Sequence, residues 1–320
     1  MKKFRVLITL ILIWSLSAPV NAATLLIPGG QVVGLELQDN TVTVAAFDEP
    51  LGAAARSAGL KEGDRILRID NTAITCTEDV RKALSCSDGQ VDISILRGTK
   101  TKQLTLCPTA TANGPKLGVY LKQGTTGIGT VTYYEPQSHD YAALGHGVNT
   151  QNGNLLQLTQ GSIFSAKVQT VKKGAIGTPG QLMGALQDSK PVGTIGANTS
   201  QGVFGRVDFV PKTEPLPVAK NQEIHTGTAT IRSTVDGDAL REYSVEIIKI
   251  YPNAKDRCRN MLLKITDPDL LAATGGIVQG MSGSPIMQDG KLVGAVTHVL
   301  VNDPTTGYGI FIENMLDAAV

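Results

Sequence analysis

Along most of this chain, apolar residues recur in short runs at alternate positions, which is the periodicity of β-strands. In the first third, such runs predict strands over Thr41–Phe47, Arg65–Asp70 and Val91–Arg97. Two stretches between them, Ala53–Leu60 and Thr77–Leu84, predict short helices, and Thr77 is of a residue type that caps helix N-termini. The pattern therefore predicts a small α+β unit near the N-terminus.

From about residue 116 onward, short apolar runs alternate with glycine-rich turns. Asp236-Gly237-Asp238 is typical of a hairpin turn, and Ile312–Ala319 predicts a short closing helix. Many short strands separated by turn signals favour a barrel-like β domain. The strands predicted most clearly are Gly127–Thr132, Val203–Val210, Tyr243–Ile250, Leu262–Asp267 and Leu292–Val296.

The first residues predict an export signal. Lys2, Lys3 and Arg5 precede a short apolar run over Val6–Leu16, and Val20-Asn21-Ala22 places small residues where signal peptidase cleaves. The run is shorter than the roughly 20 apolar residues that a membrane span needs. We therefore expect residues 1–22 to be a signal peptide, with an uncleaved membrane anchor as the alternative. In either case the rest of the chain is expected outside the membrane of the producing cell.

Composition narrows the class of protein. The chain has 320 residues, is 42% hydrophobic, and has 29 basic and 28 acidic side chains for a net charge of +1. This length suggests two domains, and the hydrophobic fraction is enough for a substantial core. A balanced charge argues against nucleic acid or an anionic membrane surface as the main partner.

The cysteines and histidines do not indicate a metal site. Cys76, Cys86, Cys107 and Cys258 contain no CxxC pair, and the four histidines are scattered, so no metal or other cofactor is expected. An exported protein can form disulfides, but the spacing assigns no pairing.

Candidate chemistry concentrates in Thr274–Val299, TGGIVQGMSGSPIMQDGKLVGAVTHV. Ser282 lies between glycines in the hexapeptide Gly280–Pro285. Nucleophilic catalysis needs an exposed hydroxyl on a tight turn whose backbone N–H groups converge on an oxyanion. The alternatives are an ordinary polar β-turn and, for the nucleophile, Ser284, although Pro285 biases Ser284 toward an extended conformation.

His146 lies between two glycines directly after an apolar run, in LGHGV. A general base in this setting would accept the serine proton, whereas a lone histidine is more often structural. His298 follows the strand after Ser282 and is interpreted as a pocket or structural residue. His225 lies in a polar context and is interpreted as non-catalytic.

The serine segment resembles chymotrypsin-like peptidases, and the longer runs TGGIVQGMSGSPI and GAVTHVLVNDPTTGYGI closely resemble the SpoIVB peptidases, the S55 serine peptidases of endospore-forming bacteria. The resemblance implies a chymotrypsin-like β-barrel with catalytic His146, Asp267 and Ser282, and an oxyanion hole formed by the N–H groups of Gly280 and Ser282. Asp267 also precedes Pro268, so the alternative is that it only begins a helix or turn.

The run AGLKEGDRILRIDN resembles a PDZ domain, and the expected fold is therefore mainly β, with an α+β PDZ domain before the peptidase barrel. By this resemblance, Val33, Gly34 and Leu35 would bind a peptide's C-terminal carboxylate, and Val80 and Leu84 would line the groove. The alternative is that these apolar residues are core. The predicted boundaries are residues 30–107 for the PDZ domain, 108–115 for a linker and 116–320 for the peptidase.

The resemblance implies an exported serine endopeptidase of sporulation. Its expected protein substrates are a membrane-bound inhibitor of a sigma-factor processing complex and its own N-terminal region, and its PDZ domain is expected to bind peptide C-termini. The expected location is the space between the two membranes around the forespore, after export across the forespore membrane. The alternative is a PDZ adaptor without catalysis. An HtrA-like quality-control protease is disfavoured because its PDZ domain usually follows the protease domain.

Overall fold

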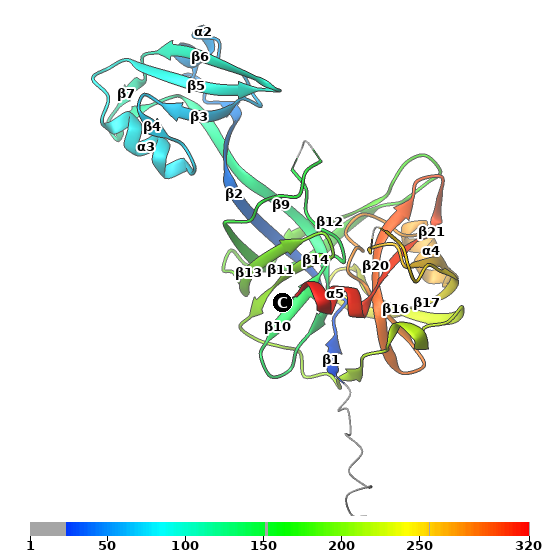
Figure 1. Cartoon of the computed structure of the whole chain (residues 1–320). Coiled ribbons are helices and arrows are strands. Elements are labelled where there is room, and N and C mark those ends of the chain that lie inside the picture. The colour runs from blue at the N-terminus through cyan, green and yellow to red at the C-terminus, as the bar shows by residue number, and fades with distance from the viewer. Residues whose placement is uncertain (1–23, 151–152, 256, 320) are drawn as a thin grey trace, which may run out of the picture.

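The structure, a computed structural model, describes residues 24–150, 153–255 and 257–319. Within these residues, most strands form two closed barrels that lie side by side, and a smaller α/β unit extends from one of them (Figure 1). The mainly β fold predicted from the sequence is confirmed.

The first barrel contains six of the described strands. The path β9-β10-β14-β13-β11-β2 is closed because β2 also pairs with β9. Its core contains Val131, Tyr141 and Ile163. The strands are β2 (Val32–Phe47), β9 (Val119–Tyr134), β10 (Asp140–Ala143), β11 (Gln160–Lys172), β13 (Gly193–Thr199) and β14 (Gly202–Val207).

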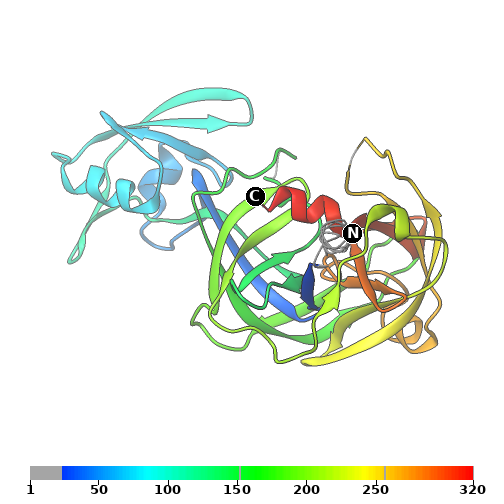
Figure 2. The same ribbon diagram turned by 60° about the horizontal axis from the view of Figure 1, so that its bottom comes forward.

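The second barrel is also closed by six described strands, in the order β16-β17-β18-β21-β20-β19. In β17, Tyr243, Val245 and Ile247 are buried and alternate with exposed residues, so the period-two pattern sets which face forms the core. The strands are β16 (Gly227–Asp236), β17 (Ala239–Ile250), β18 (Met261–Ile265), β19 (Pro285–Gln288), β20 (Lys291–Leu300) and β21 (Asp303–Phe311). Figure 2 views the two barrels from another side.

The PDZ domain is inserted into the hairpin between the first two strands of the first barrel. β2 and β9 pair in the barrel over Val32–Leu37 and pair again in the PDZ domain over Val42–Phe47. Figure 1 shows this two-stranded ribbon running out of the barrel into the PDZ domain. The domain adds α2 (Ala53–Ser57), β3 (Arg65–Ile69), β4 (Thr72–Ala73), α3 (Thr77–Ser85), β5 (Val91–Arg97) and β6 (Lys100–Leu106).

The predicted domain boundaries are corrected by this pairing. Val32–Leu37 belong to the barrel and not to the PDZ domain, and the predicted linker contains a small hairpin of β7 (Thr109–Thr111) and β8 (Gly114–Lys116). The apolar pattern of Val32–Leu37 fits a strand in either domain, and only its partners decide between them.

The remaining elements cover the barrels. The predicted C-terminal helix is α5, which packs Ile312 and Met315 into a hydrophobic cluster. The other elements are β1 (Leu25–Pro28), β12 (Gln181–Leu186), β15 (Leu216–Pro217), the 3₁₀ helix η1 (Asn221–Glu223) and α4 (Pro268–Thr274). None of the described helices is long and apolar enough to cross a membrane. The predicted signal peptide, residues 1–22, lies outside the described residues.

Cys76, Cys86 and Cys107 carry free thiols, and the buried Cys258 thiol donates to the Ser200 carbonyl oxygen at 2.9 Å.

Candidate active site

Ser282 lies on a tight turn that enters the second barrel, between α4 and β19. Its neighbours Gly280 and Gly283 have φ angles of 100° and 97°. A Cβ atom at Gly283 would lie 2.0 Å from the Thr130 carbonyl oxygen, so the close approach of the two barrels here requires glycine. Ser282 is partly exposed and lines a cavity of about 570 Å³ between the barrels, together with His146.

Ser284, the other serine of this turn, is fully buried. Its hydroxyl donates to the Ser233 hydroxyl at 3.1 Å. A substrate therefore reaches Ser282 and not Ser284.

The Ser282 hydroxyl donates to the carbonyl oxygen of Thr297 at 2.8 Å. No hydrogen bond between Ser282 and His146 occurs in the described part of the chain, although both residues line the same cavity. Catalytic hydrogen bonds are often absent before substrate binds, so this arrangement fits a resting state of the site.

His146 follows β10 of the first barrel. Its Nδ1 lies 3.0 Å from the Gly147 carbonyl oxygen, which can only accept, so Nδ1 carries the proton and Nε2 is the free acceptor in the neutral ring. Burial lowers the pKa of His146, and the hydrogen bond to Gly147 opposes this shift. The imidazole is thus kept neutral, as a general base must be.

The loop that carries His146 is held by Asn198 of β13, a residue that the sequence pattern did not reveal. The Asn198 side chain accepts from the Val148 N–H at 2.9 Å and donates to the carbonyl oxygens of Val148 and Leu156, both at 2.9 Å. A hydrophobicity pattern has no signal for such a contact, because its partners are backbone groups. The ring of His298 packs near that of His146, with centroids 5.2 Å apart, and lines the cavity as predicted.

The structure does not bring Asp267 to this site. Asp267 is the N-cap of α4, where its carboxylate accepts from the N–H groups of Asp269 and Leu270, each at 3.0 Å. It also accepts from the Ser244 N–H at 3.2 Å. The prediction that Asp267 orients His146 is therefore corrected: an aspartate before proline here begins a helix, which was the alternative interpretation.

The donors of the predicted oxyanion hole, the N–H groups of Gly280 and Ser282, line the cavity on the nucleophile turn. Within the described residues, neither the Gly280 nor the Ser282 N–H donates to a protein acceptor. The Gln279 carbonyl accepts from the Leu182 N–H at 2.8 Å. Because the N–H and C=O of a trans peptide point in opposite directions, this bond directs the Gly280 N–H away from Leu182. The Thr130 hydroxyl donates a hydrogen bond to the next carbonyl oxygen, that of Gly280, at 2.7 Å.

The predicted PDZ carboxylate loop is wrong. Val33, Gly34 and Leu35 pair on one edge with β9 and on the other with β11, so their backbone is used within the barrel. Val80 and Leu84 are 4% exposed and belong to the PDZ core, which favours the alternative interpretation of both residues.

Another apolar-Gly-apolar segment, Leu117-Gly118-Val119, leads into β9 beside α3. Over Val119–Gln123, β9 pairs with β2, and no other described strand pairs with this stretch. Leu117 belongs to the same hydrophobic cluster as Val80 and Leu84 of α3. This edge has the strand-plus-helix arrangement to which a peptide can add a strand.

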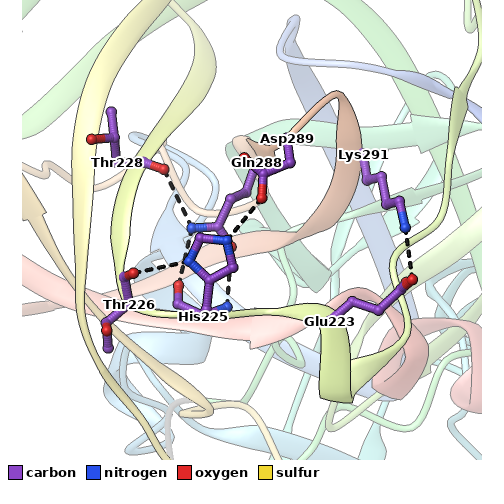
Figure 3. A network of polar contacts seen from close by, with 7 residues as sticks. All are labelled: Glu223, His225, Thr226, Thr228, Gln288, Asp289 and Lys291. Carbon is purple, nitrogen blue, oxygen red and sulfur yellow. Dashed lines mark hydrogen bonds and ion pairs between the residues drawn. The ribbon is translucent and has the colours of Figure 1, made fainter.

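His225 lies outside the cavity, in a polar network on the second barrel (Figure 3). Its Nε2 lies 2.8 Å from the Asp289 carboxylate and its Nδ1 lies 2.9 Å from the Thr226 carbonyl, and these contacts raise its pKa. The interpretation of His225 as non-catalytic agrees with this position.

Residues 113–316 match the family model of the SpoIVB peptidases, S55. The chain belongs to the SpoIVB peptidase family. The match covers the second barrel and most of the first, including His146 and Ser282. The matched family is described as a peptidase family, S55.

Two curated relatives match short parts of the chain. The hypothetical zinc metalloprotease Atu1380 of Agrobacterium fabrum is 33% identical over 79 residues, which cover 24% of this chain and 21% of that protein. The mitochondrial serine protease HTRA2 of Drosophila willistoni is 36% identical over 58 residues, 18% of this chain and 13% of that protein. The chain thus spans about a fifth or less of the length of either relative.

Solved structures resemble separate parts of the SpoIVB-family chain. The active form of the Rv3671c protease from M. tuberculosis matches with a TM-score of 0.38 and 14% identity, over 60% of this chain and 72% of that one. The PDZ domain of an SdrC-like protein from Listeria monocytogenes matches with a TM-score of 0.22 and 24% identity, over 26% of this chain and 87% of that one.

Proposed function

We propose that the chain is a serine endopeptidase, with Ser282 as its nucleophile and His146 as its general base. The observation that carries the proposal is the single cavity in which a partly exposed serine, a neutral histidine and two free backbone N–H groups meet. No carboxylate of the described residues hydrogen-bonds to His146. The Gly147 carbonyl takes the place of that carboxylate in holding the ring.

In the proposed reaction, the Ser282 hydroxyl turns from the Thr297 carbonyl and gives its proton to Nε2 of His146 while Oγ attacks the scissile carbonyl carbon. The Gly280 and Ser282 N–H groups donate to the resulting oxyanion. His146 then returns the proton to the departing amine, and water hydrolyses the acyl-enzyme by the same route.

Covalent labelling of a protein that comprises residues 24–320 tests this proposal directly. A fluorophosphonate probe is expected to label the wild type once, and peptide mapping should place the adduct on Ser282. Ser282→Ala should not be labelled, while Ser284→Ala is the matched control and should still react. A folded wild type that the probe does not label would favour the PDZ adaptor instead.

We further propose that the enzyme acts in sporulation, as an exported protease that cleaves a membrane-bound regulator of a sigma-factor processing complex and its own N-terminal region. Membership of the SpoIVB family supports this role. In an endospore-forming bacterium that lacks its own S55 peptidase, the wild-type chain should restore heat-resistant spores and Ser282→Ala should not. Restoration by Ser282→Ala would contradict a proteolytic role.

The proposed PDZ site is the unpaired edge of β9 from Leu117 to Gln123, beside α3. Peptides with a free C-terminal carboxylate are expected to shift the backbone amide resonances of this segment, and the same peptides with an amidated C-terminus should bind more weakly. Shifts centred on Val33–Leu35 would contradict this site.

A further inference from the structure

The walls of the cavity around Ser282 carry no acidic side chain, lysine or arginine among the described residues. Apolar side chains dominate these walls, including Leu35, Leu144, Ile277, Val299 and Val301, and the ionisable groups are His146 and His298. Lys255 and Arg257 line a different cavity, which shares His146 and His298 but not Ser282, and Arg257 is paired with Asp317. The surface next to the proposed nucleophile is therefore uncharged.

Two segments fix where the substrate residue before the scissile bond must lie. Ile277–Gly280 leads into the nucleophile turn and forms one wall. Thr297 and Val299 of β20 line the other; β19 pairs with β20 only as far as Ala295, so an extended peptide can pair with β20 beyond that point. Consider a peptide paired with this part of β20 whose scissile carbonyl oxygen lies at the Gly280 and Ser282 N–H groups. The side chain of the substrate residue before the scissile bond then lies between the two walls.

Ile277 closes the floor of this space. Its side chain is 2% exposed, and a Cβ atom at Gly307 would lie 2.6 Å from its Cδ1 atom, so Ile277 already fills the gap between the walls. Its backbone is fixed by an N–H bond to the Pro304 carbonyl at 2.8 Å. The floor thus offers a methyl group where a peptidase selective for basic residues would need a carboxylate.

We infer that the enzyme cleaves after medium-sized aliphatic residues and that Ile277 is a specificity-determining residue. This inference rests on the proposed role of Ser282. An aliphatic side chain is stabilised by leaving water for an apolar site, whereas a charged one loses hydration without gaining a partner. Discrimination of at least about tenfold is expected.

The test uses tripeptidyl diphenyl phosphonates that differ only in the residue at the phosphorus, which mimics leucine, arginine or glutamate. Ser282 Oγ forms a bond to phosphorus as a P–O bond to phenoxide breaks, and the serine proton leaves with phenol by way of His146. On residues 24–320, the leucine probe should react at least about tenfold faster than the other two.

Two variants, at Val301 and Ile277, test the lining of the cavity. Val301→Asp adds a carboxylate at a site that is 46% exposed and should shift the arginine-to-leucine rate ratio toward arginine by at least about tenfold. Phe209→Asp, at a position that is 67% exposed in another cavity, is the matched control and should leave the ratio unchanged. Ile277→Ala should raise the rate of a phenylalanine probe relative to leucine; if it does not fold, Val301→Asp still decides.

A faster arginine or glutamate probe, or three equal rates, would overturn the inference. So would labelling of Ser282 by a small fluorophosphonate when no peptidyl probe reacts, because an aliphatic side chain would then not fit. If the small probe also fails, the proposed role of Ser282 fails, and the inference fails with it.

Discussion

At the scale of single residues, His146 sets the pH range of the enzyme. Burial lowers its pKa, and only the neutral ring can accept the Ser282 proton. The acid limb of activity should therefore have its midpoint below the ordinary histidine value of about 6.5. The rate of fluorophosphonate labelling, measured from pH 4.5 to 8, reports this midpoint. A midpoint above 6.5 would show that His146 is not the titrating base or is not buried in solution.

Asp267 provides a second prediction at this scale, because a helix cap and a catalytic orienter respond differently to substitution. Asp267→Asn keeps a side-chain oxygen for the N–H groups of Asp269 and Leu270. We expect this variant to keep its labelling rate within a few-fold, whereas the same change in a catalytic triad costs about 10⁴ in rate. Asp267→Ala should lower the free energy of unfolding by about 1 kcal/mol.

Urea denaturation of both variants, alongside labelling, separates the two roles. A thousandfold loss in Asp267→Asn with unchanged stability would restore Asp267 to the catalytic group.

Ser282 and His146, which the structure brings to one cavity, are residues whose local sequence pattern carries the chemistry. Ser282 and its flanking glycines form one continuous motif, and His146 lies between two glycines. Asp267 had two local interpretations, and the local pattern was equally consistent with both. The local sequence around Asn198 gave no indication of its role, because that role depends on a loop some 50 residues earlier in the chain.

At the scale of elements, β9 connects the first barrel to the nucleophile turn. The Thr130 hydroxyl, fully buried, donates to the Gly280 carbonyl, and the Thr130 N–H donates to the Ser282 carbonyl at 3.1 Å. Thr130→Val keeps the shape but leaves the Gly280 carbonyl without its donor, at a cost of about 1–3 kcal/mol. If the turn relaxes to recover that energy, the Gly280 N–H moves from the oxyanion hole.

We therefore expect Thr130→Val to lower kcat by about tenfold or more with little change in KM. Thr132→Val is the matched control: it makes the same change two residues along β9, where the buried hydroxyl has no hydrogen-bond partner among the described residues. Steady-state kinetics on a peptide substrate should leave the control at wild-type kcat. Equal losses in both variants would indicate a general effect on β9 and not on the turn.

The sequence pattern predicted which segments form helices and which form strands, but it did not predict which strands pair with each other. The helix predicted over Thr77–Leu84 matches α3, and the strand over Val91–Arg97 matches β5. Val32–Leu37 was assigned to the wrong domain because the chain passes through the barrel before it enters the PDZ domain. Periodicity reports which face of a strand is buried, and it contains no information on which strand lies beside it.

At the scale of the whole molecule, this insertion decides which parts can fold alone. The family match begins at residue 113, yet the first barrel needs β2, which lies between β9 and β11. Residues 116–320 lack β1 and β2 and would expose the edges of both neighbouring strands. We expect this truncation to be unfolded or aggregated and not to react with a fluorophosphonate.

An internal deletion should behave in the opposite way. Leu37 pairs with Thr125 where the ribbon leaves the barrel, so a two-residue Asn-Gly turn in place of residues 38–124 closes the same hairpin without the PDZ domain. Because every strand of both barrels remains, this variant should fold, label on Ser282 and lose binding of carboxylate-ended peptides. Circular dichroism and labelling measured on both proteins give the comparison. The opposite result would be a truncation 116–320 that folds and reacts while the internal deletion is unfolded. It would mean that the first barrel does not need β2, and the insertion topology would then be wrong.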